Sequence, residues 1–471
     1  MNKHTILPSL TLLLVLNALR LNADDKPTAT SADKASAAAF AASANEPHQL
    51  KNQKFHTSTL FSADSLNRSG MGECVIQVFK GNVYGVYGQQ GDERIMVAKV
   101  PLDGSAAVTM PLVKGTDTEE KGYRARKDNH SIYIIAVDGS GYIHVCGGMH
   151  SALITYWRSD RPENVSSFSR YTPDDKQPPG KQPCPIAGHI TFPHFFSDHH
   201  GQLFWSCHQG CGPLCSYDET TKLWTALGSK LGTMASSAKE RDYISFFYED
   251  NKSYSTPDPD RVKGGMTSRG FDLAWDSKNR MHMAIGLLNI DAHAKGRHTG
   301  SATDILYAYS DDGGKTVFKS NGKQIQLPIR AEAGPNQGEV ILTANDVSVS
   351  SQPVIAVDKE DRPVIWCHSY KTGDHCFRLE SGQWVDHPTA PVAGSISTDP
   401  GGVMVGRTKK DCFTRFWNLD GRNVQTLDFP VLNYDKAYYQ HTGELIWTSL
   451  SGKSTSSTYT IHRTVFDRVS K

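Results

Sequence analysis

Short β-hairpin patterns recur along this chain, and their recurrence constrains the fold more than any other feature. Each pattern has a short apolar strand, a polar turn carrying Asp, Gly or Asn, and a second strand that ends in polar residues. Successive patterns begin 40 to 83 residues apart, and no stretch has the sustained periodicity of an amphipathic helix. Seven patterns can be found, with starts at Val75, Ile134, Phe195, Phe271, Val354, Gly394 and Tyr438.

Unequal all-β repeats of this length suit blades of about four strands each better than a solenoid with a short fixed period. The sequence therefore predicts an all-β fold, a seven-bladed β-propeller over residues 55–471. A two-domain β-sandwich arrangement is the alternative. The stretch from Ser310 to Thr316 matches the turn pattern S-x-D-x-G-x-T of Asp-box hairpins in sialidase-type propellers, where its role is structural.

The first 54 residues indicate an exported protein. Residues 1–23 combine a basic start with an apolar stretch too short for a membrane span, which predicts a cleaved signal peptide. Residues 24–54 are rich in Ala, Ser, Thr, Lys and Asp, as expected for a low-complexity flexible linker. We expect a secreted or periplasmic monomer with no membrane contact after cleavage. The formal net charge of +1 gives no global field to attract nucleic acid.

The second hairpin pattern carries a histidine at each mouth. His130 stands just before its first strand and His150 just after its second, with Arg126 close by in the sequence. Two imidazoles held by one rigid hairpin beside a cation suit proton transfer on an anionic substrate. The alternative is that both are ordinary surface histidines in a chain that has 19.

Three segments carry a family resemblance: DNHSIYIIAVDGSGYIHVCGGMH, TFPHFFSDHHGQLFWSCHQG and TDILYAYSDDGGKT. Together they resemble the BNR-repeat propeller family that includes the ulvan lyases of polysaccharide lyase families 24 and 25 and related rhamnose–glucuronate-cleaving propellers. It implies a secreted lyase that cleaves a uronate-containing, ulvan-like anionic polysaccharide by β-elimination. In that family an Asn-His or His-Asn pair opens the hairpin and a second His follows about twenty residues later. Asn129, His130 and His150 match those positions.

Two positions depart from the family pattern. The lyases carry Thr-Tyr-Pro, whose Tyr helps to move protons, and an Arg sixteen residues later that neutralises the uronate carboxylate. Here Phe192 replaces the Tyr and His208 replaces the Arg. A phenyl ring cannot carry a proton, and imidazolium is a more conditional neutraliser than guanidinium.

The departures leave three functions open. For a lyase, we expect His130, His150 and His208 to be catalytic, with substrate contacts from Arg126, Asn129, Phe192, Arg261 and Arg269. The two last arginines could compensate for the missing one, or could be solvated loop charges. A glycoside hydrolase of the related rhamnosidase type needs no carboxylate neutraliser and is the second possibility. A non-catalytic glycan-binding propeller is the third.

Cysteines form a further cluster. Three residues separate Cys207 from Cys211, and three separate Cys211 from Cys215. Cys184 lies upstream, and several histidines lie between Cys184 and Cys215. Thiolates with an imidazole would make a closed structural zinc site, although this spacing is not that of a standard zinc finger. Disulfides are the equal alternative in an exported protein. Calcium is a second candidate ion.

Overall fold

The computed structural model is all β. It describes residues 55–65, 75–91, 93–113, 131–149, 154–174, 176–178, 180–185, 191–208, 213–231, 243–247, 266–289, 302–330, 334–343, 353–358, 360–369, 372–387, 396–398, 403–407, 414–418, 424–427, 437–440, 444–453 and 456–466. Every regular element in these ranges is a β-strand. The same ranges contain no helix with the length and hydropathy needed to cross a membrane.

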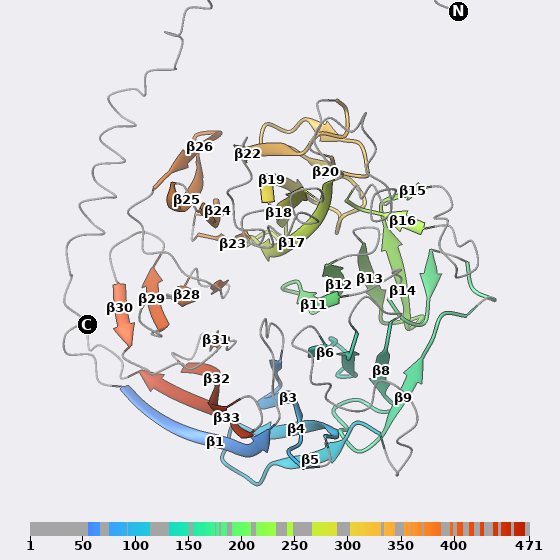
Figure 1. The fold of residues 1–471 in the computed structure, drawn as a ribbon, viewed down its shortest axis with the longest axis vertical. Helices are drawn as coiled ribbons and strands as arrows, with labels where there is room; N and C mark the ends of the chain where they lie inside the picture. Colours follow the sequence, from blue (N-terminus) through green and yellow to red (C-terminus); the bar gives the residue numbers. More distant parts are fainter. Residues whose placement is uncertain are drawn as a thin grey trace, which may run out of the picture.

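The described strands form antiparallel sheets arranged around a common centre (Figure 1). Seven sheets have four or more strands, and an eighth has two. β6, β11, β17, β23 and β31 lie nearest the centre, and β1, β5, β9 and β30 lie outermost (Figure 1). The predicted all-β propeller is confirmed. The predicted count of seven blades stays a prediction, with which the seven larger sheets agree.

We number the blades along the chain. The first has β2 (Ile76–Phe79), β3 (Asn82–Gly88), β4 (Ile95–Pro101) and β5 (Val108–Pro111). The second has β6 (Tyr133–Val137), β7 (Ile143–Gly147), β8 (Tyr156–Ser159) and β9 (Phe168–Tyr171). The third has β11 (Thr191–Ser197), β12 (Leu203–His208), β13 (Leu214–Asp218) and β14 (Leu223–Leu227), with β10 (Lys181–Gln182) at its edge.

The fourth blade is the largest. It has β17 (Met266–Trp275), β18 (Met281–Asn289), β19 (Ala302–Ser310), β20 (Val317–Phe318), β21 (Gln324–Ile325) and β22 (Glu339–Thr343). The two-stranded sheet before it joins β15 (Ser229–Leu231) to β16 (Tyr243–Ser245).

Three blades complete the ring. The fifth has β23 (Val354–Val357), β24 (Pro363–Ser369), β25 (Gly373–Glu380) and β26 (Gln383–Asp386). The sixth has β27 (Ile396–Thr398), β28 (Val403–Arg407), β29 (Thr414–Asn418) and β30 (Val424–Leu427). The closing blade has β31 (Ala437–Gln440), β32 (Glu444–Lys453), β33 (Ser456–Phe466) and β1 (Phe55–Ser65). Each of the seven predicted hairpins supplies the two innermost strands of one blade.

The hydrophobic core is divided among the interfaces between neighbouring blades. One cluster joins the first and second blades, a second joins the second and third, and others lie between the third and fourth and between the fourth and fifth. A fifth cluster packs the first blade against the closing blade. Strands such as β6 are therefore buried along their whole length, which explains their continuous apolar sequence.

An aspartate closes the innermost hairpin of four consecutive blades in the same way. The backbone N–H of each aspartate donates to the carbonyl of the residue four positions later, and each carboxylate accepts that residue's backbone N–H; the four are Asp138, Asp198, Asp276 and Asp358. Such Asp turns are favoured because the side chain replaces a backbone acceptor. The sequence repeat is thus a repeat of turn chemistry.

Neighbouring turns are hydrogen-bonded to one another. Ser277 donates its N–H and its hydroxyl to the Asp361 carboxylate, at 2.8 and 2.6 Å. Asn279 donates to Asp198 at 2.9 Å, and the N–H of His199 returns a bond to Asn279. The turns of the third, fourth and fifth blades therefore lie together on one face of the propeller, which we call the turn face.

The Asp-box turn has the hydrogen bonds that its sequence predicts. Asp312 accepts from the Thr316 N–H at 2.8 Å and from the Thr316 hydroxyl at 2.7 Å. Gly313 and Gly314 adopt φ angles of +69° and +91°, which glycine reaches without strain. Burial opposes ionisation of Asp312, but the bonds from Thr316 and Ser310 hold its pKa below the ordinary value.

Candidate functional site

The open ends of the innermost hairpins lie opposite the turn face, because each strand pair crosses the blade from its turn to its mouth. We call this second side the open face. In the second blade the mouth is marked by the Tyr133–Gly147 pair, and in the third by the Thr191–His208 pair. In the fourth blade Met266 pairs with Asn289 there. Sequence reasoning placed its candidate residues at these mouths.

Several predicted site residues lie outside the described residues. They are Arg126, Asn129, His130, His150, Arg261 and Cys211. Their immediate neighbours Ser131 and Met149 are described, and both are buried at the mouth of the second blade. The backbones of His208 and Arg269 are described, in β12 and β17. The roles predicted for all these residues stay predictions.

The mouth of the second blade is held in a tight conformation. A Cβ atom on Gly147 would lie 2.4 Å from the Ile132 carbonyl oxygen, so only glycine allows β7 to approach β6 this closely. The Thr155 hydroxyl donates to the Gly147 carbonyl, and the Thr155 N–H contacts the Met149 sulfur at 3.2 Å. The chain that leads from β7 towards position 150 is therefore fixed by its own neighbours up to Met149.

Two adjacent innermost strands carry a β-bulge at the open face. In β11 the pairing register shifts between Thr191 and Pro193, so that Phe192 is the extra residue. In β17 it shifts between Ser268 and Gly270, so that Arg269 is the extra residue. Bulges re-aim side chains and are enriched next to active sites. Two residues that the sequence singled out for substrate contact thus occupy the same kind of irregularity in neighbouring blades.

Phe192 is also strained. Its φ is +50°, a left-handed conformation that is unusual for an aromatic residue and more so before proline. Its side chain is 6% exposed and packs in the cluster between the second and third blades. Such strain costs about 1–3 kcal/mol, and the strained conformation persists only where the surrounding structure imposes it. The position where the family pattern has a proton-carrying Tyr is therefore buried in this protein.

Buried histidines that sequence reasoning did not select form ordered networks. His144 Nδ1 lies 2.6 Å from the Tyr156 hydroxyl, and its Nε2 lies 3.1 Å from Asp138 Oδ2. Burial lowers the pKa of His144 against the opposing effect of Asp138, and so favours the neutral form of the ring. His282 repeats the tyrosine contact, with the Tyr307 hydroxyl 2.7 Å from its Nδ1. Both rings are buried, so we expect their role to be structural.

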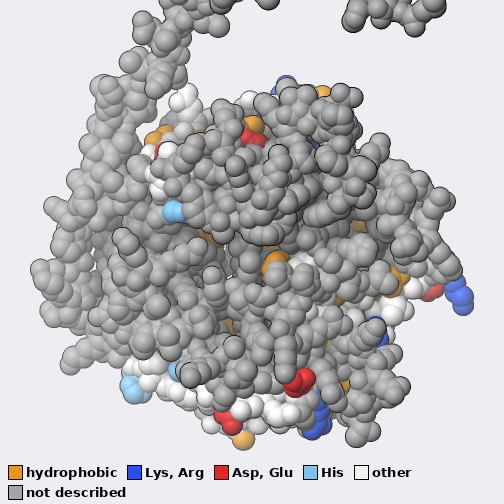
Figure 2. Space-filling view, viewed as in Figure 1, with side chains coloured by type: hydrophobic (Ala, Val, Ile, Leu, Met, Phe, Trp, Pro, Cys, Tyr) orange, Lys and Arg blue, Asp and Glu red, His pale blue; other side chains and the backbone are white. Residues whose placement is uncertain are grey.

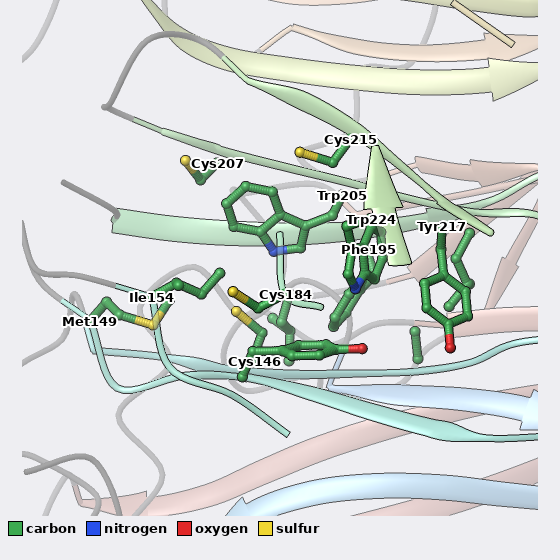
Figure 3. Close-up of a cluster of buried hydrophobic side chains, with 14 of the residues drawn as sticks. Cys146, Met149, Ile154, Cys184, Phe195, Trp205, Cys207, Cys215, Tyr217 and Trp224 are labelled. Carbon is green, nitrogen blue, oxygen red and sulfur yellow. The ribbon is translucent and has the colours of Figure 1, made fainter. Parts of the chain in front are cut away.

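The four cysteines of the predicted metal site divide between described and undescribed residues. Cys184, Cys207 and Cys215 are buried thiols in the cluster between the second and third blades. Figure 3 shows Cys184 beside Cys146, with Trp205 between this pair and the sulfurs of Cys207 and Cys215. Within the described ranges, no three His, Cys, Asp or Glu side chains gather as a metal site requires. With Cys211 undescribed, the zinc site stays a prediction.

Two further cysteines lie in the fifth blade. Cys367 pairs with His375 and Cys376 with Trp366, so the two cysteines point to opposite faces of the sheet. Both are buried thiols. A Cys367–Cys376 disulfide does not form, because the register separates the two side chains.

Charged side chains of the described residues are interspersed on the visible face. In the space-filling view, these charged groups appear near the rim. Basic and acidic groups lie close together at its lower and right edges (Figure 2). This distribution agrees with the net charge of +1. Electrostatic recognition of an anion would have to be local.

The chain has relatives among known families and structures. The BNR repeat-containing family matches residues 84–391, more than half of the chain. No curated protein matches it. Among solved structures, a polysaccharide lyase of family PL25, an ulvan lyase bound to GlcA(1-4)Rha3S, is 12% identical with a TM-score of 0.50, and the alignment covers 83% of each chain.

Propellers with other activities are also similar. An α-L-arabinanase of Penicillium chrysogenum complexed with arabinobiose is 9% identical, with 70% of this chain and 92% of that chain covered and a TM-score of 0.41. Virginiamycin B lyase from Staphylococcus aureus is 10% identical, with 88% and 99% covered and a TM-score of 0.42. At 12% identity, the likeness to the ulvan lyase structure shows a shared fold and no particular reaction.

Proposed function

Because the chain belongs to the BNR repeat-containing family, we propose that it is a carbohydrate-active propeller enzyme, and more narrowly a polysaccharide lyase. Its substrate would be a uronate-containing anionic polysaccharide, cut by β-elimination. The similar ulvan lyase structure supports this choice. The signal peptide expected in residues 1–23 supports an exported enzyme, and such polymers are met outside the cytoplasm.

The observation that carries the proposal is the pair of bulges at Phe192 and Arg269. They lie at the mouths of adjacent innermost strands, on the face where sequence reasoning also places His130, His150 and His208. Ligand sites of propellers are built from loops that converge at one face of the ring. Irregular strand ends in two neighbouring blades support such a site, since β-bulges re-aim side chains and are enriched next to active sites.

Elimination assigns each residue a task. One of His130 and His150 takes the proton at C5 of the uronate, and the electron pair left behind forms the C4–C5 double bond. The bond from C4 to the leaving oxygen breaks, and the other histidine protonates that oxygen. The C5 proton is acidic only when the neighbouring carboxylate is neutralised. Asn129, Arg126, His208, Arg261 and Arg269 are the candidates for that task.

A glycoside hydrolase is the second candidate, and one observation favours it. The Phe192 ring is buried and has no hydroxyl, and His208 stands where the related lyases have an arginine. Hydrolysis needs no neutralised carboxylate at C5 and tolerates both changes. A glycan-binding propeller without catalysis would tolerate them as well.

Product analysis separates the three functions. The full protein is incubated with ulvan and with other uronate polymers, and ultraviolet absorbance and reducing ends are followed together. A lyase produces unsaturated uronate, which absorbs, in step with new reducing ends. New reducing ends without absorbance indicate a hydrolase and reject the lyase proposal. Polymer retention with neither signal indicates a binding protein.

A further inference from the structure

The outer strands of the fifth blade hold a hydroxyl, an imidazole and a carboxylate in a line. The Thr372 hydroxyl oxygen lies 2.6 Å from Nε2 of His375. The Nδ1 atom of the same ring lies 2.6 Å from Asp386 Oδ2. The other Asp386 oxygen accepts the Cys376 N–H at 3.2 Å, which fixes the carboxylate from the backbone.

The imidazole is held in one orientation. Its ring stacks on Phe377, with the centroids 5.5 Å apart and the planes only 6° from parallel. Because the carboxylate accepts from Nδ1–H, Nε2 carries the lone pair and faces the hydroxyl. This is the division of labour in a nucleophile–base–carboxylate triad, which is recognised by geometry and roles and not by position in the sequence.

The reacting end of the line is accessible. Thr372 is exposed, whereas the side chains of His375 and Asp386 are only 12% and 31% exposed. β24 leaves the Asp358 turn on the turn face and ends at Ser369, so the β24–β25 connection with Thr372 lies on the open face. The Thr372 hydroxyl is thus on the face of the propeller where the proposed polysaccharide site lies, but in a connection between strands of another blade.

We propose that Thr372, His375 and Asp386 form a second catalytic site that hydrolyses esters of small acyl groups, such as acetyl groups on sugar hydroxyls. His375 Nε2 takes the hydroxyl proton while Thr372 Oγ1 attacks the ester carbonyl carbon. The tetrahedral intermediate expels the alcohol, which receives the proton from His375. Water, deprotonated by His375, then attacks the acyl-threonine and releases the carboxylic acid and the free hydroxyl.

The closing blade offers a matched control. The Ser449 hydroxyl lies 2.7 Å from Nε2 of His462, but in the described residues no carboxylate pairs with that ring. Burial lowers the pKa of His462 to about 4. The Ser449–His462 pair therefore has a hydroxyl and an imidazole, as the proposed site does, but no carboxylate among the described residues.

The test uses the full protein with p-nitrophenyl acetate and no polysaccharide, so its result is independent of the lyase proposal. We expect Thr372→Val and Asp386→Asn to lower the rate of p-nitrophenol release at least ~100-fold. Thr372→Ser keeps the nucleophile and should keep the rate. Ser449→Ala should release p-nitrophenol at the wild-type rate. Melting temperatures of all variants are compared with the wild type.

A covalent readout supports the kinetics. The acyl-enzyme is trapped by acid quenching during turnover, and peptide mass spectrometry locates the added acetyl group. Acetyl on Thr372 in the wild type, and on the serine of Thr372→Ser, supports the proposal even if Thr372→Val folds poorly. Equal rates in wild type, Thr372→Val and Asp386→Asn, or acetyl found only on lysines, would overturn it.

Discussion

The His144 ring joins Tyr156, 2.6 Å from its Nδ1, to Asp138, 3.1 Å from its Nε2, in a chain of bonds inside the second blade. The carboxylate accepts from Nε2–H, so Nδ1 accepts from the Tyr156 hydroxyl. In the fourth blade, His282 Nε2 is 3.6 Å from Asp276, too far for a hydrogen bond. The two blades therefore form a natural comparison.

We expect Asp138→Asn to destabilise the protein more than Asp276→Asn. Both aspartates close equivalent turns by accepting a backbone N–H at 2.8 Å, but only Asp138 bonds a buried imidazole. Losing a charge-assisted buried bond costs about 1.5–3 kcal/mol. Urea unfolding of the two variants measures the difference. Equal losses of unfolding free energy would show that the carboxylate stabilises the protein through the turn alone and not through the histidine.

Stability should fall in mild acid through His462. Burial lowers its folded-state pKa to about 4, below the ordinary 6.5, so the unfolded chain takes up the proton first as the pH drops. The stabilisation is present above about pH 6.5 and is lost as the pH approaches 4. Between pH 7 and pH 5, His462 should remove about 2 kcal/mol of unfolding free energy.

The matched variant for that measurement is His462→Gln, which cannot titrate. Its unfolding free energy should depend less steeply on pH than that of the wild type. His144 and His282 also have lowered pKa values and contribute in the same direction in both proteins, so the difference in slope isolates His462. Identical slopes would mean that His462 stays hydrated in the native state.

His130→Ala and His150→Ala should each reduce turnover of the polysaccharide at least ~100-fold, because general acid–base residues usually contribute that much. Their melting temperatures should match the wild type. The measurement is the initial rate of product formation, by absorbance or by reducing ends. Near-wild-type rates in both variants would remove this hairpin mouth from the site.

His208→Arg tests the substitution at the neutraliser position. If elimination is the reaction, the rate should be retained on the alkaline side where an ordinary imidazolium loses its charge, since guanidinium stays protonated there. Adding Phe192→Tyr should raise the rate further. Rates are measured across a pH series in both variants. A double variant that folds but does not eliminate would count strongly against the lyase proposal.

The zinc prediction is decided by elemental analysis of the purified protein. Zinc bound by Cys207, Cys211 and Cys215 would appear at about one equivalent, and chelation would lower the melting temperature because metal binding adds to folding free energy. Thiol titration in denaturant, without reductant, provides the complement. Metal-free protein with all nine thiols titratable would reject both the zinc site and the disulfides.

The hairpins could be predicted because strand pattern and turn chemistry are local. Asp138 and Asp276 stand between apolar runs, and the structure uses them as turn closers. The bulges at Phe192 and Arg269 could not be predicted, since pairing registers depend on the partner strand. The networks of His144 and His375 were missed for the same reason: their partners are 3 to 12 residues away, and each network is complete only after the strands pair.

The predicted catalytic residues lie next to the same hairpins in the sequence. Ser131 and Met149 show where the mouth of the second blade lies, and the resemblance to lyases assigns chemistry to the residues next to them. The orientation of Phe192 needed the structure, because a positive φ before proline is contrary to local preference. Because the Phe192 side chain is buried, this position does not fit the proton-transfer role that the family pattern suggested.

The pairing of β1 with β33 has a consequence for biosynthesis. These strands are hydrogen-bonded from Phe55–Phe466 to Ser65–Ser457, so the ring is joined by segments about four hundred residues apart. A ribosome must produce nearly the entire propeller before the joint can form. A chain threaded through an export channel from its N-terminus would emerge with β1 unpaired, and its ring would become complete only when β33 had followed.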